Sequence, residues 1–209
     1  LDIVSLEKYD TQKMYKVYDN WPKIARESFE SNQESVDFKN VDHIVFAGMG
    51  GSGSIGDLFS SILSKTDIHV SIVKGYLLPK TVDKNTLVIV TSVSGNTSES
   101  LTILDSAKKM DCKLIVFSSG GKMKKICENN QIEFKNIPFF HSPRTSLINF
   151  TYSILNILNP ILPIIKNDII ESLDELDRVK KEIASHNLSD SNPAINLATW
   201  ITGIPIIYY

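Results

Sequence analysis

Two clusters of small and hydroxyl-bearing residues stand where they could do chemistry. The first, Gly48-Met49-Gly50-Gly51-Ser52-Gly53, directly follows a compact apolar run, and the second, Ser92-Val93-Ser94-Gly95-Asn96-Thr97, follows another. Glycines let a backbone approach a ligand closely, and a helix beginning at either cluster would present unpaired N–H groups with a partial positive charge. Both patterns are typical of loops that bind an anion, most naturally a phosphate.

A purely structural turn explains the first cluster poorly. It explains the second cluster, taken alone, as well as a binding loop does. A tight strand-to-helix turn needs one or two glycines, whereas residues 48–53 contain four. Ser, Asn and Gly are common turn residues, so residues 92–97 alone are compatible with a turn or a binding loop. We interpret the two clusters together as phosphate loops, with Asn96 and Glu99 spaced as a capping box.

A nicotinamide-nucleotide enzyme is a weaker alternative. Gly48, Gly50 and Gly53 fit the dinucleotide fingerprint G-x-G-x-x-G. That fingerprint works with an acidic residue near the end of the second strand, which binds the ribose. Here the expected second strand is followed by Lys74, and Asp67 lies before the strand.

The elements that position both clusters follow from the hydrophobic pattern. Short apolar runs predict five strands, and the segments between them mostly carry helical spacing, at 55–63, 98–110 and 122–129; the strands are expected at 42–47, 68–73, 86–91, 113–117 and 132–137. Strands that are apolar on both faces are typical of a parallel sheet covered on both sides. We therefore expect an α/β fold, a three-layer α/β/α sandwich whose ligand site lies at the carboxyl ends of the strands.

Arg144 is the third candidate for chemistry. Ser142 is expected to cap a helix of about fifteen residues, with Pro143 at its first position and Arg144 in its first turn. A cation at that position interacts unfavourably with the helix dipole, at a cost of about 0.3–1 kcal/mol. An arginine there is explained if its guanidinium binds an anion. The alternative is a surface salt bridge of little energetic value.

The flanks of the sheet are predicted to be helical. Residues 11–30 have helical spacing with a break at Asn20 and Pro22, and Asp168 with Glu171 forms a capping signature for a later helix. The terminal residues 203–209 look like the start of a buried strand. Because an uncovered apolar strand invites edge pairing, we expect the chain to be the front part of a longer one.

The composition is that of an ordinary soluble globular protein and excludes several classes. With 42% hydrophobic and 22% charged residues and a net charge of −2, the 209-residue chain lacks the basic excess of a nucleic-acid binder. No apolar stretch reaches the length of a membrane span. Cys112 and Cys127 match no metal spacing, so we expect free thiols in a reducing cytoplasm.

Four motifs in order resemble one known family. GMGGSG at 48–53, SxSGNT at 92–97, FSSGG at 117–121 and SPR at 142–144 look like the sugar isomerase (SIS) domain, in its bifunctional phosphoglucose/phosphomannose isomerase branch. The resemblance covers roughly residues 40–209. It implies a flavodoxin-like sheet of five parallel strands. It also implies an N-terminal helical segment at 1–40, a SIS domain at 41–165, and connecting helices with the first strand of a second, truncated SIS domain at 166–209.

The resemblance also implies an activity and its residues. It implies an aldose–ketose isomerase of glycolysis and gluconeogenesis that acts on hexose 6-phosphates, without cofactor or metal. The composition favours a cytoplasmic protein, and the nearly all-apolar helix after Arg144 is expected to pack against the second half or against a twin subunit, as in a homodimer. Arg144 would act at the reacting carbons, and the phosphate would be bound by Gly50, Gly51, Ser52, Ser92, Ser94 and Thr97. The family's glutamate base, ring-opening histidine and a further lysine lie beyond the first domain. The other interpretation is a non-catalytic, sugar-phosphate-binding regulatory SIS protein.

Other titratable residues carry no motif. Glu171, Glu175 and Glu182 have the spacing of a solvated helix face. His43 and His69 lie in expected strands and His186 follows the expected long helix. His141 lies near Arg144 in the sequence, and we interpret it as a loop histidine.

Overall fold

The computed structural model describes residues 2–205 and contains a sheet of five parallel strands in the order β2-β1-β3-β4-β5. The strands are β1 His43–Ala47, β2 His69–Val73, β3 Thr86–Ser92, β4 Lys113–Ser118 and β5 Glu133–Asn136. Each lies within a residue or two of its predicted position. Central β3 is buried along its whole length, as expected for a strand flanked by β1 and β4 and covered on both faces.

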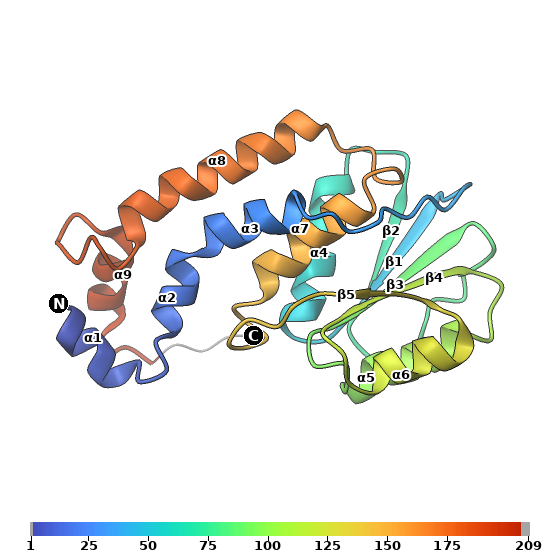
Figure 1. The fold of residues 1–209 in the computed structure, drawn as a ribbon, viewed down its shortest axis with the longest axis horizontal. Helices are drawn as coiled ribbons and strands as arrows, with labels where there is room; N and C mark the ends of the chain where they lie inside the picture. Colours follow the sequence, from blue (N-terminus) through green and yellow to red (C-terminus); the bar gives the residue numbers. More distant parts are fainter. Residues whose placement is uncertain (1, 206–209) are drawn as a thin grey trace.

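Helices cover both faces of the sheet, so the predicted α/β/α sandwich is confirmed (Figure 1). Side chains alternate along β1, because successive residues of a strand point to opposite faces. Ile44 and Phe46 belong to the core under α4 and α7, whereas Val45 and Ala47 belong to the core under α5 and α6. These four helices are α4 Gly51–Leu63, α5 Ser98–Ala107, α6 Gly121–Asn130 and α7 Leu147–Ile157.

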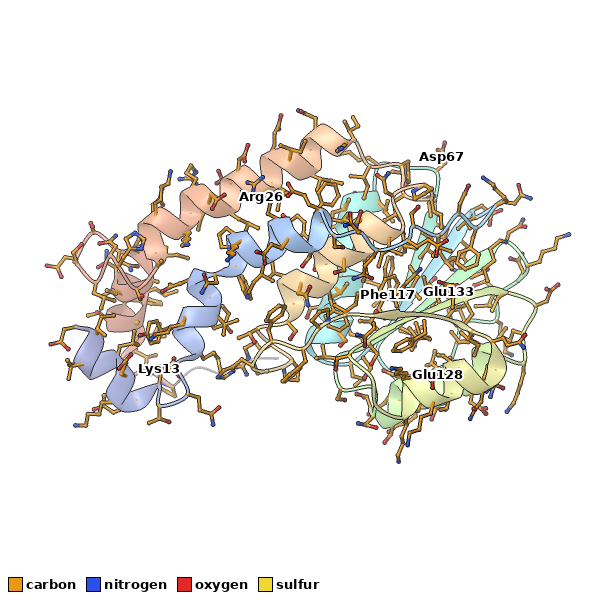
Figure 2. The ribbon with its side chains drawn as sticks, in the orientation of Figure 1. Lys13, Arg26, Asp67, Phe117, Glu128 and Glu133 are labelled. Atoms are coloured by element: carbon orange, nitrogen blue, oxygen red, sulfur yellow. The ribbon has the colours of Figure 1, made fainter. Side chains whose placement is uncertain are left out.

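The remaining described helices extend away from the sheet (Figure 1). They are α1 Ile3–Tyr9, α2 Met14–Asp19, α3 Trp21–Phe29, α8 Lys166–Ile183 and α9 Pro193–Ile201. The predicted break at Asn20 and Pro22 is confirmed, since Asn20 separates α2 from α3. Helix α3 packs on α7 and α8, and its Arg26 forms ion pairs with Asp174 and Asp177 of α8 at 3.1 and 3.2 Å (Figure 2).

The predicted capping box of α8 is wrong. The helix begins at Lys166 with Ile165 at the N-cap, so Asp168 lies inside the first turn. Glu171 instead accepts a hydrogen bond from the Asn167 side chain at 2.8 Å. An acidic residue anywhere in the first turn interacts favourably with the helix dipole, so Asp168 can favour this terminus without capping it.

The strand predicted for residues 203–209 lies mostly outside the described residues. Residues 203–205 follow α9 without regular structure, and residues 206–209 are not among those described. Among residues 2–205, no helix combines the length and the apolar character needed to cross a lipid bilayer.

Candidate functional site

The two glycine- and hydroxyl-rich clusters follow neighbouring strands. Strands β1 and β3 are hydrogen-bonded in parallel with Ala47 opposite Val90, so their carboxyl ends meet at the same edge of the sheet. Helix α4 then crosses one face of the sheet and α5 the other (Figure 1). The strand order changes direction between β1 and β3, which is where open α/β sheets bind ligands.

The loop after β1 is held close to the helix that it starts. Helix α4 begins at Gly51, four residues before its predicted start, with Gly50 at the N-cap and a φ of +54°. An added Cβ at Gly48 would lie 2.8 Å from the backbone of Ser52. Gly48 N also donates to the Val73 carbonyl at 3.1 Å, tying the loop to β2. Gly50, Gly51 and Ser52 thus form the N-cap and first turn of a 13-residue helix, where backbone N–H groups lack helical acceptors.

The loop after β3 is closed by its own hydroxyl groups. Ser92 is buried, and its Oγ lies 3.0 Å from Thr97 Oγ1 and accepts from Gly95 N at 3.2 Å. Ser94 is exposed, and its Oγ accepts from Asn96 N at 3.3 Å. Thr97 is the N-cap of α5. The three hydroxyl residues therefore gather at the start of a second helix.

The capping box predicted for Asn96 and Glu99 is wrong. Thr97 occupies the N-cap, and the Asn96 side chain is engaged elsewhere, since its Oδ1 accepts from Lys122 N at 3.1 Å. Glu99 lies in the first turn of α5, where its charge raises the pKa of Tyr76 from the loop after β2. The loop after β3 thus contacts the loop after β4 directly, and the helix that follows it lies near Tyr76 of the loop after β2.

A further loop, after β4, supports the second cluster and was not assigned a role from the sequence. Gly95 and Gly121 both have positive φ, of +66° and +67°, and their loops interlock. A Cβ at Gly95 would lie 1.9 Å from the Gly120 carbonyl oxygen, and one at Gly121 would lie 2.5 Å from the Ser94 carbonyl oxygen. Gly95 O also accepts from Met123 N at 3.0 Å. The paired glycines Gly120 and Gly121 directly after a strand were the signal for this support.

Lysines gather beside that interlocked pair of loops. A groove of about 560 Å³ is lined by Asn96 and by residues of α6, including Lys122, Lys124, Lys125 and Glu128. Three positive charges against one negative charge raise the local potential and attract anions from solution.

Arg144 lies in a turn before α7, so its predicted position in the first turn of a helix is wrong. Helix α7 begins at Leu147 with Ser146 at the N-cap. Ser142 does accept from Thr145 N at 3.4 Å, but this closes a separate turn that is held by hydroxyl groups onto the Phe140 carbonyl. The dipole argument for Arg144 therefore does not apply.

The Arg144 turn nevertheless lies beside the first cluster. A Cβ at Gly51 would lie 3.7 Å from the carbonyl oxygen of Pro143. Arg144 is exposed, and within residues 2–205 it forms no ion pair. The surface salt bridge considered from the sequence is therefore not seen in that part of the chain. The turn that carries Arg144 thus approaches the first turn of α4, where an arginine side chain could reach an anionic ligand.

The remaining titratable candidates lie elsewhere. His43 and His69 are in the first positions of β1 and β2, at the amino end of the sheet, with ring centroids 4.8 Å apart. Glu175 is paired with Arg178, which lowers the pKa of that carboxyl. Asp67 precedes β2 (Figure 2). Lys74 directly follows β2 and is paired with Asp57 at 2.5 Å. No described acid thus takes the ribose position of a dinucleotide site.

Comparison with known proteins agrees with this arrangement. A family model described as the SIS domain matches residues 37–158. Two curated relatives are bifunctional phosphoglucose/phosphomannose isomerases. The one from Caldicellulosiruptor bescii is 31% identical over 208 residues, which cover 93% of this chain and 60% of the relative. The one from Aquifex aeolicus is 32% identical over 179 residues, covering 83% of this chain and 55% of the relative.

A solved structure shares the fold. A hypothetical protein from Thermus thermophilus superposes with a TM-score of 0.63 at 18% identity, over 88% of this chain and 47% of that one. This chain therefore spans little more than half the length of the curated relatives and about half of that solved chain.

Proposed function

The chain belongs to the SIS domain family, and on that premise we propose that its protein is an aldose–ketose isomerase. The reaction interconverts glucose 6-phosphate, mannose 6-phosphate or both with fructose 6-phosphate. The observation that carries the proposal is the start of α4 and α5 at the carboxyl ends of neighbouring strands, with glycine and hydroxyl residues at both starts. The names of the curated relatives give it further support.

In this proposal the phosphate of the substrate binds between the two helix starts. Backbone N–H groups of the first turns and neutral hydroxyls can hold a phosphoryl group without a metal, and both helix dipoles favour its negative charge. The residues that we assign to this role are Gly50, Gly51, Ser52, Ser92, Ser94 and Thr97. Anchoring the phosphate leaves the sugar carbons free for other groups.

Arg144 is the residue that we assign to the reacting end of the sugar. Aldose–ketose isomerisation opens the ring, removes a proton beside the carbonyl and returns it to the neighbouring carbon. The intermediate is an enediolate, so a fixed positive charge near its two oxygens lowers the barrier. The carbon skeleton undergoes no net oxidation, and the scheme therefore uses no redox cofactor.

The proton-transferring groups are not assigned to the described residues. We propose that the base and the ring-opening group are supplied by protein beyond residues 1–209, and that 1–40, 41–165 and 166–209 act as helical segment, SIS domain and connection to a second SIS domain. A cytoplasmic homodimer serving glycolysis and gluconeogenesis completes the proposal. The length of the curated relatives supports the need for further residues.

Turnover by the complete gene product tests this function. We expect conversion of glucose 6-phosphate or mannose 6-phosphate to fructose 6-phosphate, and a kcat about 10²–10³-fold lower for Arg144→Gln, in line with the loss of one group that stabilises a developing oxyanion. Substrate binding, measured by calorimetry, should persist in that variant because the phosphate loops are intact. Binding of hexose 6-phosphate with no turnover of either sugar would instead favour the regulatory SIS protein.

A further inference from the structure

The turn that carries Arg144 is held by a residue from outside the matched domain. Trp21 Nε1 donates a hydrogen bond to the carbonyl oxygen of Thr145 at 2.9 Å, across 124 positions of sequence. Thr145 follows Arg144 directly and is fully buried. The SIS match begins at residue 37, so this contact joins the N-terminal helices to the turn.

Trp21 itself has a fixed place. It is the first residue of α3, Pro22 follows it in the first turn, and its ring meets that of Tyr18 edge-on at 4.9 Å. Helix α3 packs against α7, which begins just after the Arg144 turn. An indole has a single N–H donor, so the bond to Thr145 O uses all of its hydrogen-bonding capacity.

His141 supplies a second link between the same two regions. Its Nε2 lies 3.2 Å from the carbonyl oxygen of Gln12, in the connection between α1 and α2. A carbonyl only accepts, so Nε2 carries the proton. His141 has a φ of +52°, and its Nδ1 is enclosed without a hydrogen-bond partner among residues 2–205. A non-glycine residue keeps such a strained backbone only where its surroundings over-determine it.

The turn between these two links is internally stiff. Thr145 Oγ1 donates to the carbonyl oxygen of Phe140 at 2.6 Å, and Ser146 Oγ bonds the same oxygen at 3.2 Å. Because these bonds close the turn onto itself, a shift of Thr145 moves the neighbouring backbone of Arg144. The Arg144 side chain, by contrast, is exposed and has no ion pair within the described residues, so its position depends on that backbone.

We propose that Trp21 is a positioning residue for Arg144: its indole bond to Thr145 O holds the turn so that the guanidinium is in place for the enediolate. The proposal rests on the function given above for Arg144. A cation that is already in place stabilises developing charge without reorganisation, whereas a mobile one loses that advantage. The N-terminal helices are then part of the isomerase site.

A pair of matched tryptophan variants of the complete gene product tests the proposal. Trp21→Phe keeps an aromatic ring but removes the donor, and Trp200→Phe makes the same change on α9, where the ring is 71% exposed. We expect kcat to fall roughly 10- to 100-fold in Trp21→Phe, because small misplacements of a catalytic group have effects of that size. The KM should change less than about twofold, since the phosphate loops are untouched. Trp200→Phe should change neither constant by more than about twofold.

Fluorescence gives a readout that a merely structural role would not move. In the Trp200→Phe background, Trp21 is the one tryptophan left within residues 1–209. Its emission is therefore taken as the difference between the Trp200→Phe protein and the protein that carries both Trp200→Phe and Trp21→Phe. Hexose 6-phosphate should shift its emission, because the sugar reaches Arg144, whereas inorganic phosphate fills only the loops and should leave it unchanged. Equal shifts with both ligands, or a kcat within twofold of wild type in Trp21→Phe, would overturn the proposal.

A second variant covers the case in which Trp21→Phe fails to fold. His141→Gly removes the other link, retains Trp21 and accepts the positive φ without strain. It should lower kcat about 3- to 10-fold at unchanged KM, and an unchanged kcat contradicts the proposal. If the complete gene product binds hexose 6-phosphate but turns over neither sugar, the proposed function fails, while the emission test still decides whether Trp21 senses the ligand.

Discussion

Both ends of the parallel sheet carry polar side chains, but these side chains differ in their burial and in their hydrogen bonding. At the amino end, His43 is buried and its two ring nitrogens bond Thr86 Oγ1 at 3.2 Å and Ser71 Oγ at 3.0 Å. Thr86 in turn donates to Asp83 at 3.0 Å. At the carboxyl end, Ser94 is exposed, and the loops that lead into α4 and α5 contain glycines and follow two adjacent strands.

The difference separates structural from ligand-binding polar groups. Polar side chains at the amino end form hydrogen bonds with one another. These bonds satisfy the buried groups but leave their donors and acceptors occupied, so that they cannot bind a ligand. At the carboxyl end, the Ser92 and Thr97 hydroxyls also bond each other, but Ser94 is exposed and within residues 2–205 its Oγ only accepts a hydrogen bond, so its O–H can still donate to a ligand. A histidine or serine near a strand end is therefore informative only when its partners are known.

The largest expected effect is a loss of stability caused by a substitution at Gly95, at the carboxyl end of the sheet. Gly95→Ala should lower the free energy of unfolding by about 3–5 kcal/mol, because the new Cβ would meet the Gly120 carbonyl at 1.9 Å and the φ of +66° disfavours any side chain. Urea unfolding at neutral pH measures this. Gly50→Ala is the matched control: its φ is +54°, but nothing lies within 4 Å of the added Cβ.

Strain alone predicts a loss of about 1–3 kcal/mol for Gly50→Ala. Gly75→Ala, with open space and no positive φ, should stay within about 0.5 kcal/mol of wild type. Equal losses of stability in Gly95→Ala and Gly50→Ala would mean that the close contact between the interlocked loops adds no destabilisation to that of the positive φ.

The next effect sharpens the comparison within one loop. Ser94→Ala should weaken hexose 6-phosphate binding about tenfold, the loss of one hydrogen bond to a charged group, while stability changes by less than about 0.5 kcal/mol. Ser92→Ala should lower stability by about 1–3 kcal/mol, since buried Ser92 Oγ accepts from Gly95 N. Calorimetric titration and urea unfolding of both variants separate the two roles. Wild-type affinity in Ser94→Ala would remove that hydroxyl from the site.

The smallest effect concerns the amino end and appears as a pH dependence. Burial, and then the charge of His69, lower the pKa of His43 in the folded state, while Asp83 and Asp42 oppose this more weakly. The unfolded chain takes up the proton near pH 6.5. His43 therefore has no effect on the slope well above pH 6.5, and stability falls as pH drops through 6.5 towards the folded pKa, by at most about 1.4 kcal/mol per pH unit.

Urea unfolding between about pH 7.5 and 5 measures that slope. His43→Gln removes the titrating group while keeping a polar side chain, so its slope should be shallower than that of the wild type. Parallel curves for the two proteins would show that His43 does not take part in the acid sensitivity of the fold.

Much of the sheet could be predicted from the sequence because its signal is local. Strands such as Thr86–Ser92 are apolar on both faces, and each of β1, β3 and β4 is followed by glycine or hydroxyl residues that mark its carboxyl end. The adjacency of the two clusters does not follow from this local signal, because it depends on β1 and β3 being neighbours in the order β2-β1-β3-β4-β5. The helical break at Asn20 is equally local, since Pro22 lies in the first turn of α3, where its missing N–H is tolerated and a helix start is favoured.

The features that could not be predicted depend on partners far away in sequence or on a competing local bond. Ser142 and Pro143 form a local helix signal at Arg144, but Thr145 and Ser146 bond back to Phe140 and delay the helix to Leu147. The bond from Trp21 spans 124 positions and has no local signature. The support of Gly95 by the β4 loop is signalled by the two glycines of that loop but requires the packing to be seen.

The interlocking of Gly95 with the loop at 120–121 has a practical consequence for dissecting the domain. Residues 1–110 include both clusters and three of the five strands, yet they lack the carbonyl and amide groups against which residues 94–96 take their shape. We therefore expect any minimal binding fragment to extend through residue 130. Libraries that randomise positions 95 and 121 together should return glycine at both.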